Sequence, residues 1–246
     1  NMGYSYNYNS VGGSIINNTI ASNSYSIRFN FESAGNIMYA LSKATNIRKN
    51  SNGEYAILGI PYAQYLKGEF DFAIDHRNSF AFHAGVGIAV PYGNAKTIPF
   101  EKQYFSGGAN SVRGWAVRDL GPGSFAGNGN LLDQSGDIKL DASIEYRSKL
   151  FWKFQGAIFV DAGNIWTIRD YDNQPGGVFK FDKFYKQIAV AYGLGLRLDL
   201  DFFILRFDGG MKALNPVYES GKDRYPIIHP KFSRDFAFHF AVGYPF

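Results

Sequence analysis

The segment Gln187–Leu200 reads QIAVAYGLGLRLDL and decides the fold, because large apolar residues alternate in it with small or polar ones. The large set comprises Ile188, Val190, Tyr192, Leu194, Leu196, Leu198 and Leu200. A β-strand places these two sets on opposite faces, whereas a helix would mix them around its axis. The segment is therefore predicted to be a strand with one continuous apolar face.

Eight other segments show a related alternation. In Phe80–Val90 the alternate face is small or polar, and in Ile138–Arg147 it is mostly charged. The remaining predicted strands are Met2–Tyr8, Tyr25–Glu32, Leu66–Asp75, Trp152–Gly163, Phe202–Asp208 and Phe232–Phe246. The sequence thus predicts about nine strands, each near the length that a tilted membrane strand requires.

The predicted connections alternate in length from Leu66 onwards. Tight turns are predicted at His76–Ser79, Ser148–Leu150 and Asp201, and long links at Pro91–Gly136, Ile165–Lys183 and Lys212–Lys231. Outer-membrane barrels have short turns on the periplasmic side and long loops outside. Before Leu66, both Ser10–Ser22 and Ser33–Pro61 are long, which leaves room for one more short strand.

Composition separates a membrane barrel from a soluble one. Aromatic residues make up 17% of the 246 residues, yet the mean hydropathy is slightly negative. A soluble lipocalin-type barrel would show the same period, with its apolar face inside. We favour the membrane barrel because aromatic residues stand at strand ends, as at Trp152, Tyr146, Tyr244 and Phe246, while the other face collects charges, Gly and Ala.

Other features narrow the class further. No run of 18 apolar residues is present, which excludes a transmembrane helix, and the absence of cysteine excludes disulfides and thiol chemistry. The net charge of +4 is scattered, so we expect no nucleic-acid partner. No signal peptide is visible and the chain opens in a predicted strand, so we expect a fragment of a mature protein.

The link Pro91–Gly136, here called the lumen loop, contains the most specific motif. Within Pro99–Gly123 several glycines and the aromatic residues of FEKQYFSGG surround the tetrad Val112, Arg113, Gly114 and Trp115. Such a loop is suited to turn sharply and pack on itself inside a barrel. This stretch resembles the lumen loop of the outer-membrane insertase superfamily of BamA and TamA, also called the bacterial surface antigen type. It looks like the Bacteroidetes members of this superfamily, and at Phe100–Phe105 and Leu120–Gly123 it resembles the TamA-like branch more than the BamA-like one.

An arginine at membrane depth needs a carboxylate partner. The alternation places Glu145 and Asp161 on inward faces of the next two strands, where each could bind Arg113. The alternative is an ordinary solvated arginine in an external loop. The segment containing Phe159, Asp161 and Gly163 also resembles the family strand that receives the loop arginine, which favours the lumen clamp.

The C-terminus reads FAFHFAVGYPF and ends in an alternating aromatic strand. It resembles the recognition signal of outer-membrane barrels, carried here by Phe238, Phe240, Gly243, Tyr244 and Phe246. Gly243 adds no packing and Pro245 has no N–H for a ladder, so we expect this strand to pair weakly at its end. A weak seam beside it is a candidate gate, although every barrel needs a terminal strand.

No enzyme, cofactor or metal site is predicted. The four histidines are dispersed without metal-ligand spacing, and Ser124 does not stand in a nucleophile elbow. Gly85 and Gly87 lie inside a predicted strand and not at a dinucleotide-binding turn.

The resemblance implies an all-β transmembrane antiparallel barrel of which residues 1–246 form the C-terminal portion, about nine of sixteen strands. The N-terminal strands and periplasmic POTRA domains would then be absent. It further implies an outer-membrane protein that inserts or translocates client proteins through a lateral seam, without catalysis. The expected partners are outer-membrane lipids, unfolded outer-membrane clients and periplasmic or inner-membrane accessory proteins.

Three other functions remain open from the sequence. A two-partner secretion exporter has a similar loop motif, and a patatin-like lipase carries a related barrel beside an enzyme domain. A passive porin would need no lumen clamp.

Overall fold

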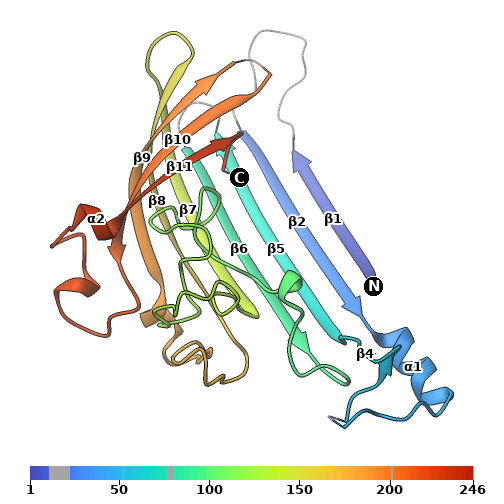
Figure 1. The fold of residues 1–246 in the computed structure, drawn as a ribbon. Helices are drawn as coiled ribbons and strands as arrows, with labels where there is room; N and C mark the ends of the chain where they lie inside the picture. Colours follow the sequence, from blue (N-terminus) through green and yellow to red (C-terminus); the bar gives the residue numbers. More distant parts are fainter. Residues whose placement is uncertain (11–22, 52, 77–79, 201, 246) are drawn as a thin grey trace, which may run out of the picture.

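The computed structural model describes residues 1–10, 23–51, 53–76, 80–200 and 202–245. Nine strands form one antiparallel sheet in chain order, interrupted only by a small hairpin (Figure 1). In sheet order they are β1 (Met2–Ser10), β2 (Asn23–Ala34), β5 (Tyr65–His76), β6 (Phe80–Pro91), β7 (Ile138–Lys149), β8 (Phe154–Trp166), β9 (Ala189–Asp199), β10 (Ile204–Leu214) and β11 (Phe236–Val242). The all-β prediction and its nine strands are confirmed.

Several predicted strand ends are wrong. Trp152 lies in a turn with a positive φ of 49°, and β8 begins only at Phe154. Strand β10 runs on to Leu214, into the predicted long link. The last strand is shorter than predicted, because the short helix α2 (Phe232–Asp235) precedes it and the chain leaves the sheet after Val242. The predicted turns at His76–Ser79 and Asp201, and the link Ser10–Ser22, fall largely outside the described residues.

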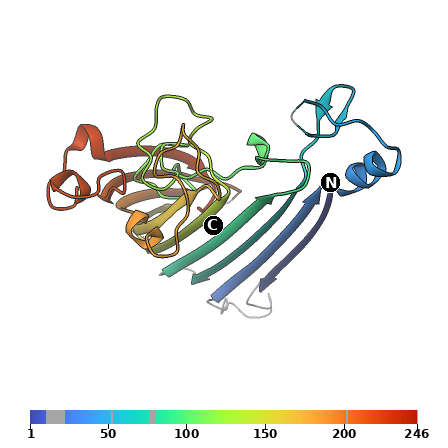
Figure 2. The same ribbon diagram turned by 90° about the horizontal axis from the view of Figure 1, so that it is seen from below.

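The sheet forms a curved wall with one concave and one convex face (Figure 2). Its first and last strands, β1 and β11, are not paired with each other in the described ranges. The concave face holds the lumen loop, residues 92–137 in the structure, which packs against the part of the wall made by the later strands (Figure 2). Strand twist and tilt bring the inward residues of distant strands towards one another across this face.

The two faces of the wall have opposite chemistry. On β9, Leu194 on the convex face is 66% exposed, whereas Arg197 on the concave face is 0% exposed. Phe80, Ile144 and Phe238 are likewise exposed on the convex face, and Glu145 is buried on the concave one. A soluble barrel would bury its large apolar side chains, so this arrangement indicates a lipid-facing exterior and a polar interior.

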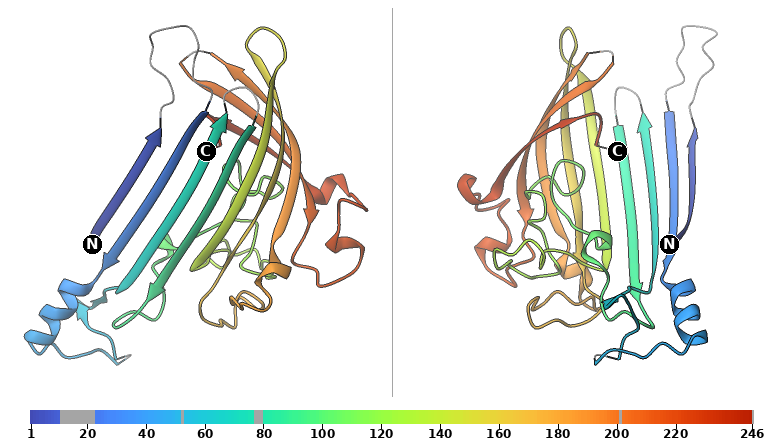
Figure 3. Two further views of the ribbon diagram at one scale, coloured as in Figure 1. Left: turned by 180° about the vertical axis from the view of Figure 1, so that it is seen from behind. Right: turned by 45° about the vertical axis from the view of Figure 1, so that its right-hand side comes forward.

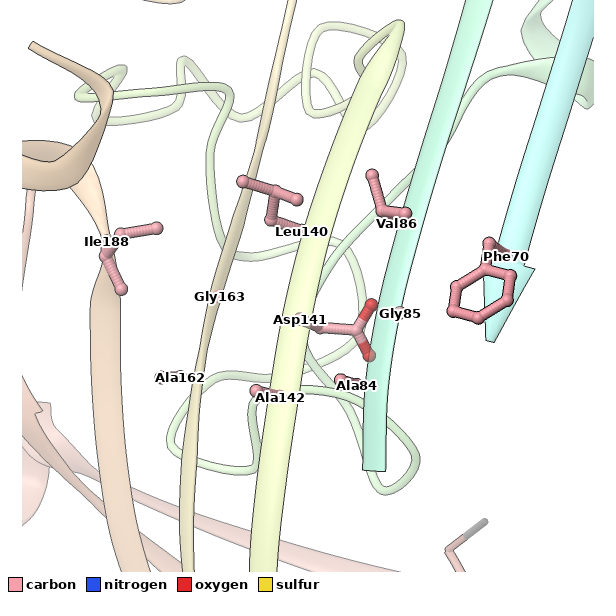
Figure 4. Close-up of a pocket in the computed structure, with 10 residues that line it drawn as sticks. All are labelled: Phe70, Ala84, Gly85, Val86, Leu140, Asp141, Ala142, Ala162, Gly163 and Ile188. Carbon is pink, nitrogen blue, oxygen red and sulfur yellow. The ribbon is translucent and has the colours of Figure 1, made fainter. Parts of the chain in front are cut away.

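The convex face is hollowed where small residues align. Ala84, Ala142 and Ala162 lie side by side in register across β6, β7 and β8. Around them is a hollow of about 440 Å³, bordered by larger residues that include Phe70 and Leu140 (Figure 4). Its lining is almost all carbon, which suits it to the acyl chains of surrounding lipid.

The link between β2 and β5 contains the helix α1 (Asn36–Ala44) and the hairpin of β3 (Ala56–Ile57) and β4 (Ile60–Pro61). The sequence patterns did not predict the helix, and the hairpin is separate from the main sheet. Both lie at the end of the wall from which the lumen loop enters, below the ends of β1 and β2 (Figure 3). Among the described helices, none has the length and apolar character needed to cross a membrane.

Candidate functional site: an arginine clamp in the lumen

Arg113 lies on the concave face, against β7, β8 and β10, and is 1% exposed. Its Nε and Nη2 donate to the two carboxylate oxygens of Asp161, each at 2.8 Å, and its backbone N–H donates to Asp161 Oδ2 at 3.0 Å. Its Nη1 donates to Glu145 Oε2 at 2.6 Å. The structure thus brings together the arginine and the two carboxylates that the alternation placed on inward faces. The bidentate ion pair with Asp161 fixes the plane of the guanidinium as well as its position.

The aromatic ring of Phe159 completes the binding site of the Arg113 side chain. The guanidinium carbon of Arg113 lies 3.4 Å from the centre of this ring, which is itself buried. Ser143 donates to Asp161 Oδ1 at 2.6 Å and accepts a bond from Arg113 Nη2 at 3.2 Å. Charged hydrogen bonds and a cation–π contact therefore hold one side chain in a site from which water is almost excluded.

A second buried arginine shares these acceptors. Arg197 on β9 donates to Glu145 Oε2 at 2.8 Å and to Asp208 Oδ1 at 2.8 Å. Asp208 on β10 also lies 3.4 Å from Arg113 Nη1. Neither Arg197 nor Asp208 is among the site residues predicted from the sequence. Because Arg197 and Asp208 are joined by their own ion pair, part of the binding site of Arg113 is held in place independently of the loop.

The rest of the tetrad packs as an apolar plug. Val112 and Trp115 are buried in one cluster with Leu120 of the loop and with Ala189 and Ala191 of β9. Gly114 lies so close to the wall that an added Cβ would be 2.8 Å from the Cβ of Ala191. The wall makes reciprocal room at Gly210 of β10, where an added Cβ would be 2.0 Å from the Arg113 carbonyl oxygen. The small residues therefore allow the two backbones to approach.

The base of the loop is anchored separately. Lys102 donates to both carboxylate oxygens of Glu32 on β2, at 2.8 and 2.9 Å, and Tyr104 pairs with Gly136 through two backbone bonds of 2.8 Å. Burial raises the pKa of the Tyr104 hydroxyl and of the Asp137 carboxyl at the end of the loop. The loop is thus tied down at its two ends and at its tip.

Comparison with known proteins identifies the family of this chain. The Omp85 superfamily domain matches residues 17–246, which is most of the chain. This chain belongs to the Omp85 superfamily. It is 35% identical over 97 residues, or 36% of the chain, to the outer membrane protein assembly factor BamA of Neisseria meningitidis serogroup B. The matched region spans 12% of that relative's length. The chain is accordingly part of an outer-membrane protein.

Two solved structures resemble this Omp85 chain more distantly. BamA from Haemophilus ducreyi lacking POTRA domains 1–3 is 15% identical with a TM-score of 0.48, over 98% of this chain and 53% of that one. CdiB from Acinetobacter baumannii is 13% identical with a TM-score of 0.36, over 97% and 46% respectively. This chain therefore spans about half the length of these proteins. The finer assignment to a TamA-like branch remains a prediction.

The predicted seam strand, β11, forms one edge of the Omp85 sheet. Phe238 and Phe240 lie exposed on its convex face. At Gly243 the backbone takes a φ of 90°, and the chain turns from the lipid-facing row. Tyr244 then lies on the concave side, where its ring contacts the guanidinium of Arg147, 4.2 Å from the ring centre. Phe246 lies outside the described residues.

The seam strand contacts the lumen loop directly. His239, on the concave face of β11, donates from Nε2 to the carbonyl oxygen of Arg113 at 2.9 Å. In the sheet it stands opposite Asp208, the carboxylate shared with Arg197. His239 is not among the residues that the sequence predicted for the site. The arginine clamp is therefore linked to the edge strand by one hydrogen bond.

One predicted residue of the receiving strand has a different setting. An added Cβ at Gly163 would meet the backbone of β7 rather than the lumen loop, 2.5 Å from the Leu140 carbonyl oxygen. The next residue, Asn164, contacts the loop instead, because its Nδ2 donates to the Gly123 carbonyl oxygen at 2.8 Å. In the described part of the chain, no three His, Asp or Glu side chains are arranged to hold a metal ion.

Proposed function

We propose that this Omp85 chain forms the C-terminal part of a barrel that inserts other outer-membrane proteins, or translocates them, through the seam beside β11. The supporting observation is that the lumen loop is bound at its tip to the wall through Asp161 and Glu145 and to the edge strand through His239. A loop held in this way stabilises the wall next to an edge strand, so that the edge can open without the rest of the sheet losing its shape.

The free edge supplies the binding chemistry. An unpaired strand in a bilayer exposes backbone N–H and C=O groups that water cannot satisfy, so a client strand gains ladder bonds by pairing with it. The exit of the chain at Gly243 shortens the ladder of β11, and the last bond is the one from Gly243 N–H to the Ile204 carbonyl oxygen at 2.8 Å. No covalent chemistry is needed, and unfolded outer-membrane proteins and periplasmic accessory proteins would be the partners.

The test uses the full-length protein in liposomes and measures the folding rate of an unfolded outer-membrane barrel protein added from outside. We expect faster folding, and we expect the acceleration to disappear in Arg113→Ala. The matched control is Arg118→Ala, which removes an arginine of the same loop whose guanidinium lies on Phe100 and Phe105 and outside the clamp. No acceleration by well-folded wild-type protein would contradict the insertion proposal.

Two further measurements distinguish the other functions. A passive porin would conduct ions strongly in planar bilayers, whereas a wall with a clamped loop in its hollow should conduct weakly until Arg113 is replaced. A polypeptide exporter would move a secreted protein through the lumen without accelerating the insertion of a barrel, so transport assays with both client types separate the two activities.

A further inference from the structure

The helix α1 is amphipathic, and unusually it is the polar side of the helix that packs against the protein. Asn36 accepts bonds from Gln64 and Tyr92 at 2.9 and 2.5 Å, and the buried Ser42 accepts one from Tyr62 at 3.1 Å. A helix on a soluble protein normally packs by its apolar face. Here hydrogen bonds to the neighbouring loops hold it in place.

The opposite side of α1 is apolar and uncovered. Ile37, Met38 and Leu41 follow one another on one helical face and are 59%, 46% and 54% exposed. In β2, the strand that leads into the helix, Phe29 and Phe31 on the convex side are also exposed. Strand β2 has 12 residues, enough to cross the apolar layer when tilted, and α1 begins two residues after its end. The helix is therefore at the level of the membrane surface.

The charges beside this face are mainly basic. Lys43 stands in the last turn of α1, and Arg48 and Lys49 follow within six residues, all exposed. Between residues 36 and 61 the one acidic residue is Glu54. Apolar residues on one side of a helix, with lysine on the polar side and basic residues just after it, are the pattern of a helix that lies in the membrane interface.

We propose that α1 is an interfacial anchor that inserts Ile37, Met38 and Leu41 into the anionic lipid surface around the barrel, on the side of the long loops. Lys43, on the polar side of the helix, and Arg48 and Lys49, in the segment that follows it, bind the lipid phosphates through their charged ends. The polar contacts of Asn36 and Ser42 set the rotation of the helix, so that its apolar face meets lipid. The anchor fixes the outer end of the wall at the strand adjoining β1.

These 246 residues contain no cysteine, so a thiol introduced by substitution is the only one in this part of the protein. In the full-length protein, Ile37→Cys and Leu41→Cys are each labelled with an environment-sensitive fluorophore after folding into vesicles that contain anionic phospholipid. The matched control is Leu131→Cys, at a leucine of the lumen loop that is 58% exposed. We expect a blue-shifted emission and quenching by lipids spin-labelled near the head group at positions 37 and 41, and neither effect at position 131.

The charge requirement is tested with the same labels. Replacing Lys43, Arg48 and Lys49 together by glutamine should lower the lipid quenching, and vesicles of purely zwitterionic lipid should lower it in the unchanged chain. Labels at 37 and 41 that are quenched by aqueous iodide as strongly as at 131 would overturn the proposal. Labels protected from both iodide and the lipid quencher would also overturn it, because a polypeptide would then cover the face. Equal lipid quenching with and without anionic lipid would overturn the role of the charges.

Discussion

Removing the Arg113 guanidinium should cost about as much as breaking a buried ion pair, roughly 3–5 kcal/mol of unfolding free energy. The structure explains this size. Arg113→Ala removes both side-chain bonds to Asp161 and the bond to Glu145, and leaves Asp161 with Ser143 and the backbone N–H of residue 113 as donors. Asp161→Ala should cost a similar amount, because it leaves a guanidinium in a site with 1% exposure.

The two losses are not independent. Each single variant leaves one charge buried without its main partner, and the double variant removes both charges. The cost of Arg113→Ala with Asp161→Ala should therefore fall short of the sum of the single costs by about 2–3 kcal/mol. Arg118→Ala is the control, since that arginine contacts two aromatic rings at 4.4 and 4.5 Å and should cost about 0.5–2 kcal/mol.

The assay is urea unfolding of the full-length protein in lipid vesicles, followed by tryptophan fluorescence, to which Trp115 contributes from within the plug. Additive costs for Arg113→Ala and Asp161→Ala would refute the argument, because they would show that the two side chains do not depend on each other. A loss in Arg118→Ala as large as in Arg113→Ala would refute it too, since the effect would then follow from disturbing any arginine of the loop.

Two further outcomes test the close packing and a charge at the seam. Gly210→Ala places a Cβ against the Arg113 carbonyl and should cost about 1–3 kcal/mol in the same urea assay; Gly209→Ala, whose Cβ would meet a movable ring at 3.1 Å, should cost less. Burial alone would raise the pKa of Asp235, but bonds from Arg234 and the backbone N–H of Lys231 lower it below the ordinary value. The stabilisation by Asp235 is therefore present above about pH 4 and is lost as the pH falls below it. As the pH falls below that value, the thermal unfolding midpoint of the wild type should approach the midpoint of Asp235→Asn. A difference between the two midpoints that does not depend on pH would contradict this role of the Asp235 carboxylate.

The alternation of residue types was enough to predict the wall and part of the site. It gave the inward direction of Glu145 and Asp161 because that property depends only on the period of two within each strand. It did not predict the offset of one strand relative to another along the barrel axis, because this offset depends on the tilt and register of the whole sheet. Arg197 and Asp208 both lie on inward faces. For that reason the alternation alone could not show that they stand beside Arg113.

Local patterns failed where a segment is short or a contact comes from a distant element. The helix α1 has only nine residues, fewer than the window in which helical periodicity is recognised. At the receiving strand, sequence resemblance indicated Gly163, whereas the loop binds the amide of the following residue, Asn164. The role of His239 depends on the approach of the loop carbonyl, which no feature of its own strand predicts.

The partners of Arg113 also bear on the order in which the barrel is assembled. Asp161, Asp208 and His239 follow Arg113 by 48, 95 and 126 residues. Contacts between such distant positions require long stretches of chain to be brought together, so they form late in folding. The loop is made before most of the strands that bind it. It is thus suited to serve as a template on which the last strands of its own barrel are laid down, with β7, β8, β10 and β11 each adding a contact to the same arginine.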